Sequence, residues 1–150
     1  MENLFEVNEV KLTYRTKQKA SERPKVFSSN SVYKVLLNCF DSDTIEYRES
    51  FKVLLLNRQN KVLGVMNISE GGIDGTTVDI RLILQAALLS NSSNIVISHN
   101  HPSGNPNPSK DDDYITMRVQ RACDAMSIKL FDHIILSADS YFSYADEGRL

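Results

Sequence analysis

The chain has 150 residues, of which 41% are hydrophobic and 24% charged, and this balance is typical of one globular domain with a buried core. The net charge of −2 excludes a globally basic surface of the kind that binds nucleic acid through charge alone. The sequence predicts a cytoplasmic protein that does not bind membranes, because it has no bilayer-length apolar run and no apolar signal-peptide segment at its start. Its two cysteines, Cys39 and Cys123, are far apart, fit no paired metal spacing and are expected to be buried thiols of a reducing compartment.

The first part of the chain is polar and weakly patterned. We expect residues 1–30 to form an N-terminal arm and residues 31–150 to form the domain, with a short strand over residues 9–14 of the arm. Residues 11–25 hold six Lys or Arg side chains against one Glu. We interpret this basic stretch as a solvated arm, and contact with a polyanion is the alternative.

The rest of the chain alternates between helical and extended patterns of apolar residues. Asn30 or Ser31 is expected to cap the first helix, and the Gly-rich residues 69–77 are expected to be irregular. The order of elements predicts a single-domain α/β fold of three layers, with a mixed β-sheet flanked by helices. The expected elements are helix 30–40, strands 51–57 and 62–68, helix 78–91, strand 94–98, helix 109–126, and strands 128–137 and 141–145.

Two of the three histidines lie one residue apart, directly after the strand expected over residues 94–98. Side chains at i and i+2 of an extended segment point the same way, so His99 and His101 are expected to project together from the carboxyl end of the strand, where sites collect in α/β sheets. Three prolines stiffen the loop over residues 102–108, and Asp112 in the next helix is expected to face back toward the strand end. Two imidazoles and one carboxylate predict a catalytic zinc site with an open fourth position, and Mn, Fe and Ni are alternatives.

The acidic start of the expected helix over residues 109–126 allows other interpretations. Ser109 and Asp112 also fit a capping box, S-x-x-D, which taken alone we would prefer to a ligand role for Asp112. Asp111 and Asp113 are alternative ligands, but we interpret both as charges that complement the helix macrodipole. We favour the metal site because the histidine pair, the stiff loop and the helix start occur together.

The spacing His99-x-His101, seven residues, Ser109, two residues, Asp112 resembles the JAMM motif of the JAB/MPN metalloproteases. The local string HNHPSGNPNPS is more similar to the RadC branch of that superfamily, and the similarity extends over about residues 51–150. The resemblance implies a JAB/MPN fold, whose layout is similar to that of cytidine deaminases. It also implies a zinc-dependent hydrolase of peptide or isopeptide bonds, here without the helix-hairpin-helix region of longer RadC proteins.

The JAMM motif also needs a Glu immediately before a buried strand, and Glu49 occupies that place. The resemblance implies that Glu49 is a general base that takes a proton from the metal-bound water and returns it to the leaving amine. It implies that Ser109 donates a hydrogen bond to the developing oxyanion. Glu46 and Glu70 are alternative bases. The expected partner is a peptide or protein substrate, and the oligomeric state stays open.

Two other functions stay open at this point. RadC relatives are traditionally linked to DNA repair, and the basic arm is the one feature that favours a nucleic-acid partner. A metal-binding interaction module without catalysis is the other alternative. The zinc-deaminase signature of H-x-E followed by P-C-x-x-C does not occur in the sequence.

Four further polar residues lie close to the expected site in the sequence. Asp132 and His133 could orient a ligand imidazole, but we interpret them as a hydrogen-bonded polar pair within a strand. Asn100 and Ser103 could line the cleft or stabilise its loops.

Overall fold

A computed structural model describes residues 7–11, 13–72 and 77–150 of the chain. In chain order, the elements are a 3-10 helix η1 (Ala20–Glu22), α1 (Ser29–Leu37), β1 (Ser50–Leu56), β2 (Val62–Glu70), α2 (Ile80–Leu89), β3 (Asn94–Asn100), α3 (Lys110–Ala125), β4 (Lys129–Leu136) and β5 (Tyr141–Ser143).

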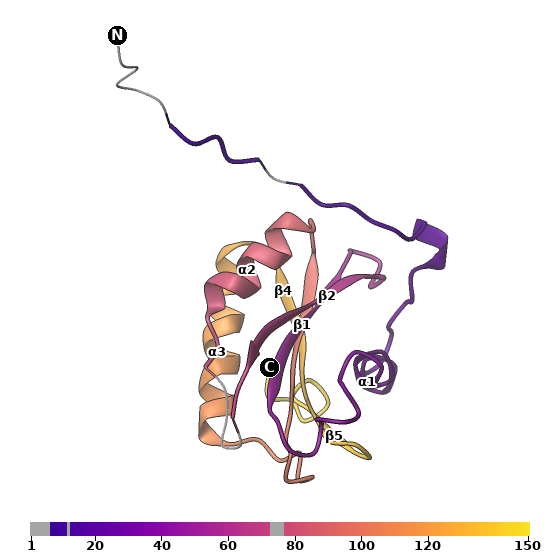
Figure 1. The fold of residues 1–150 in the computed structure, drawn as a ribbon, viewed down its shortest axis with the longest axis vertical. Helices are drawn as coiled ribbons and strands as arrows, with labels where there is room; N and C mark the ends of the chain where they lie inside the picture. Colours follow the sequence, from indigo (N-terminus) through magenta and orange to yellow (C-terminus); the bar gives the residue numbers. More distant parts are fainter. Residues whose placement is uncertain (1–6, 12, 73–76) are drawn as a thin grey trace.

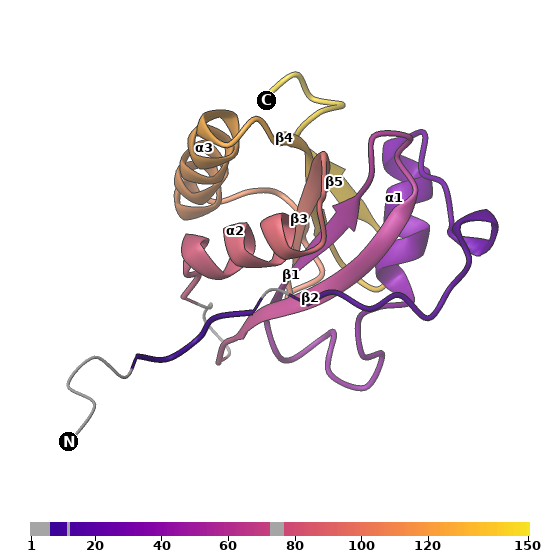
Figure 2. The same ribbon diagram turned by 90° about the horizontal axis from the view of Figure 1, so that it is seen from above.

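The strands form one five-stranded sheet in the order β2-β1-β3-β4-β5. Strands β3 and β4 are parallel and are joined through α3, whereas the other neighbouring pairs are antiparallel. Figure 1 and Figure 2 show α2 and α3 on one face of the sheet and α1 on the other. The predicted three-layer α/β fold with a mixed sheet is therefore confirmed.

The core has two parts, one on each face of the sheet. Successive residues of a strand point to opposite faces, so Val53 and Leu55 of β1 pack toward α2 and α3, and Leu54 and Leu56 pack toward α1. Strands buried on both faces need apolar residues at nearly every position, which explains the unbroken apolar run of β1. The centre of the sheet, next to the polar site, is therefore buried on both faces.

The strand predicted over residues 9–14 is wrong, since the described residues of that range form no strand. The arm instead contacts the sheet at separate points. The Tyr14 hydroxyl donates a hydrogen bond to the Leu63 carbonyl at 2.9 Å, and the backbone of Lys25 forms an isolated antiparallel β-bridge to Lys61. Val26 is already fully buried in the core. The boundary between arm and domain at residue 30 stays a prediction.

The predicted cap of the first helix is also wrong. Ser28, rather than Asn30 or Ser31, is the N-cap of α1, because its hydroxyl accepts from the Ser31 amide at 3.2 Å while the Ser31 hydroxyl accepts from the Ser28 amide at 3.0 Å. In the segment expected to be irregular, β2 continues to Glu70, and residues 73–76 lie outside the described residues. Within the described part of the chain, no helix is long and apolar enough to cross a membrane.

Candidate metal centre

Strand β3 carries both histidines to the same side of the sheet. His99 pairs with Phe51 of β1 and its ring stacks on the Phe51 ring, with centroids 5.8 Å apart. The backbone amide of His101 donates to the Leu136 carbonyl at 2.9 Å, so the extended course continues one residue beyond β3. The two Nε2 atoms lie 3.0 Å apart, as the i and i+2 spacing predicts.

Asp112 reaches the histidines from the first turn of α3. Its Oδ1 lies 3.0 Å from the Nε2 of His99, and its Oδ2 lies 3.3 Å from the Nε2 of His101. Ser109 is the N-cap of α3, and the capping box also forms: the Asp112 amide donates to the Ser109 hydroxyl at 3.1 Å, and the Ser109 amide donates to Asp112 Oδ2 at 2.7 Å. The cap therefore fixes the carboxylate beside the imidazoles, and the two interpretations of Asp112 do not exclude each other.

The spacing of these donor atoms fits a zinc ion. Nitrogen and oxygen ligands about 2.0–2.1 Å from a tetrahedral zinc ion lie roughly 3.3 Å from one another. The Nε2 atoms of His99 and His101 lie 3.0 Å apart, and they lie 3.0 and 3.3 Å from the Oδ1 and Oδ2 atoms of Asp112, respectively. One donor atom from each of the three residues lies within 4.8 Å of the others. Little movement of the side chains would be needed to hold the ion.

A buried hydrogen-bond chain sets the tautomer of His99. The Thr116 hydroxyl lies 2.6 Å from the Asp112 carbonyl, which can only accept, so Thr116 donates its hydrogen there. Thr116 must then accept from Nδ1 of His133 at 2.6 Å, which leaves Nε2 of His133 as an acceptor. Nδ1 of His99 lies 2.9 Å from that Nε2 and must donate to it. The Nε2 of His99 is thereby left with a lone pair directed at the site.

His101 reaches the same state by a shorter route. Its Nδ1 lies 2.9 Å from the carbonyl of Asn105 and must donate to it, which leaves a lone pair on Nε2. Two imidazole lone pairs and the carboxylate of Asp112 then converge within hydrogen-bond distance of one another. The two lone pairs and the carboxylate repel one another at these distances. A positive charge between them, either a metal ion or a proton on one ring, removes this repulsion.

The pKa shifts of the metal-free site reflect this convergence. Burial alone would raise the pKa of Asp112, but the close imidazoles of His101 and His99, which favour the ionised carboxylate, outweigh burial and hold that pKa far below its usual range. Burial would lower the pKa of His101, but the hydrogen bonds to Asp112 and Asn105 outweigh it, so that pKa is raised. Full burial and the neighbouring His99 lower the pKa of His133 well below its ordinary value, so His133 stays neutral.

Glu49 lies on the open side of the histidine pair. Its Oε1 is 3.9 Å from Nε2 of His99, and burial raises the pKa of its carboxyl group, while the two site histidines partly offset that effect. Glu70 pairs with Arg48 at 3.8 Å, and Glu46 is exposed and lines a separate cavity that includes His101 but not His99. Of the three candidates, only Glu49 lines the cleft that contains both histidines.

A cleft of about 600 Å³ opens over the cluster. Its walls include apolar side chains of Phe51, Val78 and Ile115. Ser109 also lines the cleft, and none of the hydrogen bonds among the described residues uses its hydroxyl hydrogen. An extended polar substrate could therefore lie against apolar walls and still meet one free donor beside the cluster.

The two neighbouring aspartates of the first turn of α3 lie apart from the cluster. Asp111 is exposed at the cleft wall. Asp113 accepts from the Tyr144 hydroxyl at 2.8 Å and pairs with Arg149 at 2.6 Å, which holds the C-terminal segment against α3. This placement agrees with the interpretation that neither is a ligand.

Comparison with known proteins identifies the family. A family model described as RadC-like JAB domain matches residues 26–149. The chain belongs to this family. It is 39% identical over 134 residues to a UPF0758 protein of Porphyromonas gingivalis, an alignment that covers 89% of the chain and 58% of the relative. It is 37% identical over 126 residues to a UPF0758 protein of Thermotoga maritima, in an alignment that covers 84% of the chain and 55% of the relative. It is 42% identical over 100 residues to a UPF0758 protein of Flavobacterium johnsoniae, in an alignment that covers 67% of the chain and 44% of the relative.

The resemblance to the RadC branch is thereby confirmed. The chain spans about half the length of the curated relatives it matches, at 44% to 58%. The names of these relatives state no activity. The ligand, base and donor roles in this RadC-like JAB domain therefore stay predictions that rest on the geometry.

Sequence reasoning missed part of the site of this RadC-like JAB domain. The amide of His133 donates to Asp132 Oδ1 at 2.7 Å, so the two residues form the hydrogen-bonded pair of our interpretation. The ring of His133 also lies 2.9 Å from Nδ1 of His99, which is the alternative role of orienting that imidazole. Thr116, whose hydroxyl lies 2.6 Å from Nδ1 of His133, is a further member of the site that the sequence does not predict. A usable signal was present, since the chain has only three histidines and the third occupies a strand expected to be buried beside the site. Asn100 and Ser103 both bond loops: Ser103 accepts from the Asn105 amide at 3.3 Å.

Proposed function

We propose that this chain is a zinc-dependent hydrolase that cleaves peptide or isopeptide bonds. One observation carries the proposal: two imidazole lone pairs and a carboxylate converge at the floor of a cleft where a half-buried glutamate also lies. The proposed metal ligands are His99, His101 and Asp112, and the proposed general base is Glu49.

A bound zinc ion would supply a Lewis acid and lower the pKa of a water molecule to about 7. Glu49 would accept a proton from the attacking water at its carboxylate and later deliver it to the leaving nitrogen. Its raised pKa suits both transfers, because a base works best when its pKa approaches the working pH. Ser109 would donate its uncommitted hydroxyl hydrogen to the developing oxyanion while its oxygen continues to cap α3.

The cleft favours an extended peptide as the substrate. Its apolar walls would remove the scissile bond from bulk water, which strengthens the electrostatic contacts of the charged groups. Protein substrates in the cytoplasm fit this assignment, and Cys39 and Cys123 form no disulfide with each other, as is common in a reducing compartment.

The test is hydrolysis of a panel of labelled peptides and fusion proteins with added zinc. We expect turnover that is lost on chelation, restored by zinc and abolished in His101→Ala, whereas Asn107→Ala in the same loop serves as the matched control and keeps full activity. Activity that survives both chelation and His101→Ala would refute the proposal. Tight zinc binding without turnover on the whole panel would favour the non-catalytic interaction module.

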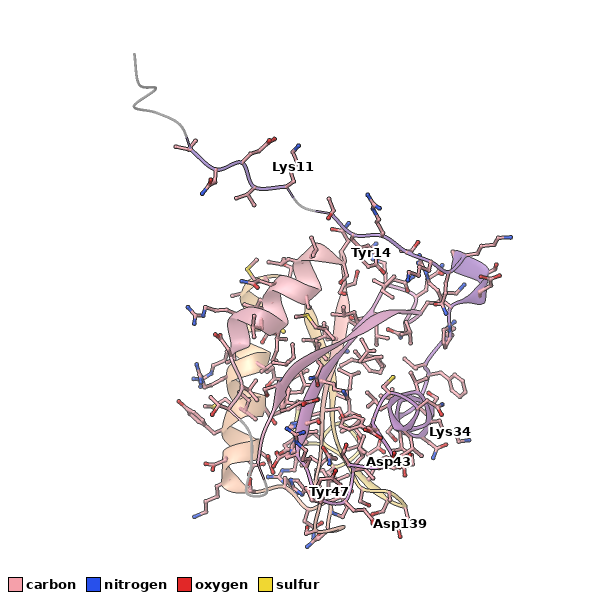
Figure 3. The ribbon with its side chains drawn as sticks, viewed as in Figure 1. Lys11, Tyr14, Lys34, Asp43, Tyr47 and Asp139 are labelled. Carbon is pink, nitrogen blue, oxygen red and sulfur yellow. The ribbon has the colours of Figure 1, made fainter. Side chains whose placement is uncertain are left out.

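A nucleic-acid partner is the second candidate, and the exposed basic arm is the observation that favours it. Lys11 lies out on the arm, away from the sheet (Figure 3), and Lys17 and Lys19 are also exposed. The arm residues around Tyr14 line a cavity with Leu63 that includes none of the proposed metal ligands. Binding through this arm would fall steeply with salt and disappear on deletion of residues 1–19. Negligible binding before and after deletion would exclude it.

A further inference from the structure

The residue proposed as general base belongs to a loop that has no regular helix or strand of its own. Residues 38–49 connect α1 to β1, and Asp43 and Tyr47 of this loop lie at the same end of the molecule as Asp139 of the β4–β5 turn (Figure 3). Glu49 is the last residue of the loop, directly before β1. A loop without ladder hydrogen bonds needs other contacts to hold a side chain in one position.

The side chain of Asn100 provides these contacts. Its Nδ2 donates to the carbonyl of Ile45 at 2.8 Å and to the carbonyl of Arg48 at 2.7 Å, and its Oδ1 accepts from the amide of Ser50 at 2.8 Å. Asn100 is 1% exposed, so water cannot readily replace these partners. Three hydrogen bonds, one buried and two partly buried, therefore bracket Glu49 on both sides in the sequence.

The position of Asn100 in the sheet explains why a side chain does this. The registered β1–β3 pairs end at Phe51 and His99, and the next amide of β1, that of Ser50, bonds the Asn100 side chain. Because side chains alternate along a strand, Asn100 points away from the face that carries His99 and His101. Residues 99–101 thus place the two proposed histidine ligands on one face of the sheet and, on the other face, the Asn100 side chain that holds the loop.

The loop has two further anchors that agree with a fixed position for Glu49. The carbonyl of Glu49 accepts from the amide of Gly71 at 2.8 Å, and the Ile45 side chain is buried against the core beside α1. These contacts fix the two ends of the segment 45–50, and Asn100 ties the ends to each other and to β3.

We propose that Asn100 is a positioning residue that holds Glu49 over the metal centre through its three hydrogen bonds to the loop. The catalytic consequence rests on the proposed hydrolase function, whereas the clamp itself does not. Only an amide side chain of this length offers two donors and one acceptor here: Asp lacks the donors, Ala lacks all three groups, and Gln is longer by one methylene.

The first experiment measures amide hydrogen exchange of the zinc-loaded protein over residues 45–50. Asn100→Ala and the isosteric Asn100→Asp should raise exchange there by about tenfold, while the zinc affinity stays within about threefold of the wild-type value because no ligand contacts the Asn100 side chain. The matched control is Asn94→Ala at the other end of β3, since Asn94 donates to Asn60 Oδ1 at 2.8 Å and clamps a different turn. This control should leave residues 45–50 protected.

The second experiment is a double-mutant cycle with Glu49→Gln. A residue that acts only through Glu49 lowers kcat, with little change in KM, in the wild-type background but has no further effect when Glu49→Gln is already present. Unchanged exchange over residues 45–50, or full additivity of the two kinetic losses, would overturn the inference. Raised exchange in a protein whose wild type hydrolyses nothing would instead refute the proposed function and leave the clamp standing.

Discussion

Replacement of Thr116 by Val tests the tautomer chain behind His99. Val has the shape of Thr but lacks the hydroxyl, so Nδ1–H of the fully buried His133 loses its acceptor. A buried unsatisfied donor costs about 1–3 kcal/mol. His133 can escape this cost by moving its proton to Nε2, which then requires Nδ1 of His99 to accept and places the His99 proton on Nε2, where the metal would bind.

Zinc binding to Thr116→Val must reverse that change, and 1–3 kcal/mol corresponds to roughly a 5- to 150-fold loss of affinity. Competition with a chromophoric chelator measures this loss, and nitrogen NMR shifts of His133 report its tautomer directly. Thr116→Ser keeps the hydroxyl and is the matched control, expected within about threefold of the wild-type affinity. Equal zinc affinity of the Val and Ser variants would show that the chain does not set the state of His99.

Three further outcomes follow from the geometry of the site. Glu49→Gln should lower turnover by about 10²- to 10⁴-fold and leave zinc affinity nearly unchanged, and a large loss of zinc would instead indicate a ligand. Because burial raises the pKa of Glu49, kcat/KM should fall as the pH decreases through a value above about 4.3, the ordinary pKa of glutamate, and a rate that is flat down to pH 4 contradicts this role. Zinc at 100 times its Kd should raise the free energy of unfolding by about 2.7 kcal/mol, read as a chelator-reversible rise in Tm; no rise would exclude binding to the folded state.

The sequence was sufficient for the parts of the fold and site that depend on local patterns. The apolar run of β1 and the spacing of His99 and His101 are properties of single extended segments, so period and burial alone determine their geometry. The capping box of Ser109 and Asp112 is equally local, and it brings the carboxylate to the strand end because α3 directly follows the loop after β3. Local rules were enough wherever both partners belong to neighbouring elements.

The parts that were missed depend on tertiary pairing or on a choice between equivalent residues. His133 reaches His99 because β4 lies parallel to β3, and Asn100 reaches Ile45 across 55 positions in the sequence. Neither contact produces a periodic pattern of residues in the sequence. The cap of α1 was misassigned because residues 28–31 read Ser-Ser-Asn-Ser, and all four side chains are good caps. The reciprocal hydrogen bonds between Ser28 and Ser31 mark where that helix begins, and local propensity alone does not choose among the four residues.

The converging acceptors of the site also predict how zinc uptake depends on pH. In the metal-free protein, the pKa of His101 is raised by its bonds to Asp112 and Asn105, so the positive charge that the site requires is a proton at lower pH. Zinc must displace that proton, and its affinity should therefore fall roughly tenfold per pH unit below the raised pKa of His101 and level off above it. Chelator competition at a series of pH values measures this slope. In His101→Ala the slope should disappear along with most of the affinity, whereas an affinity that is independent of pH in the wild type would mean that the lone pairs do not converge on the ion.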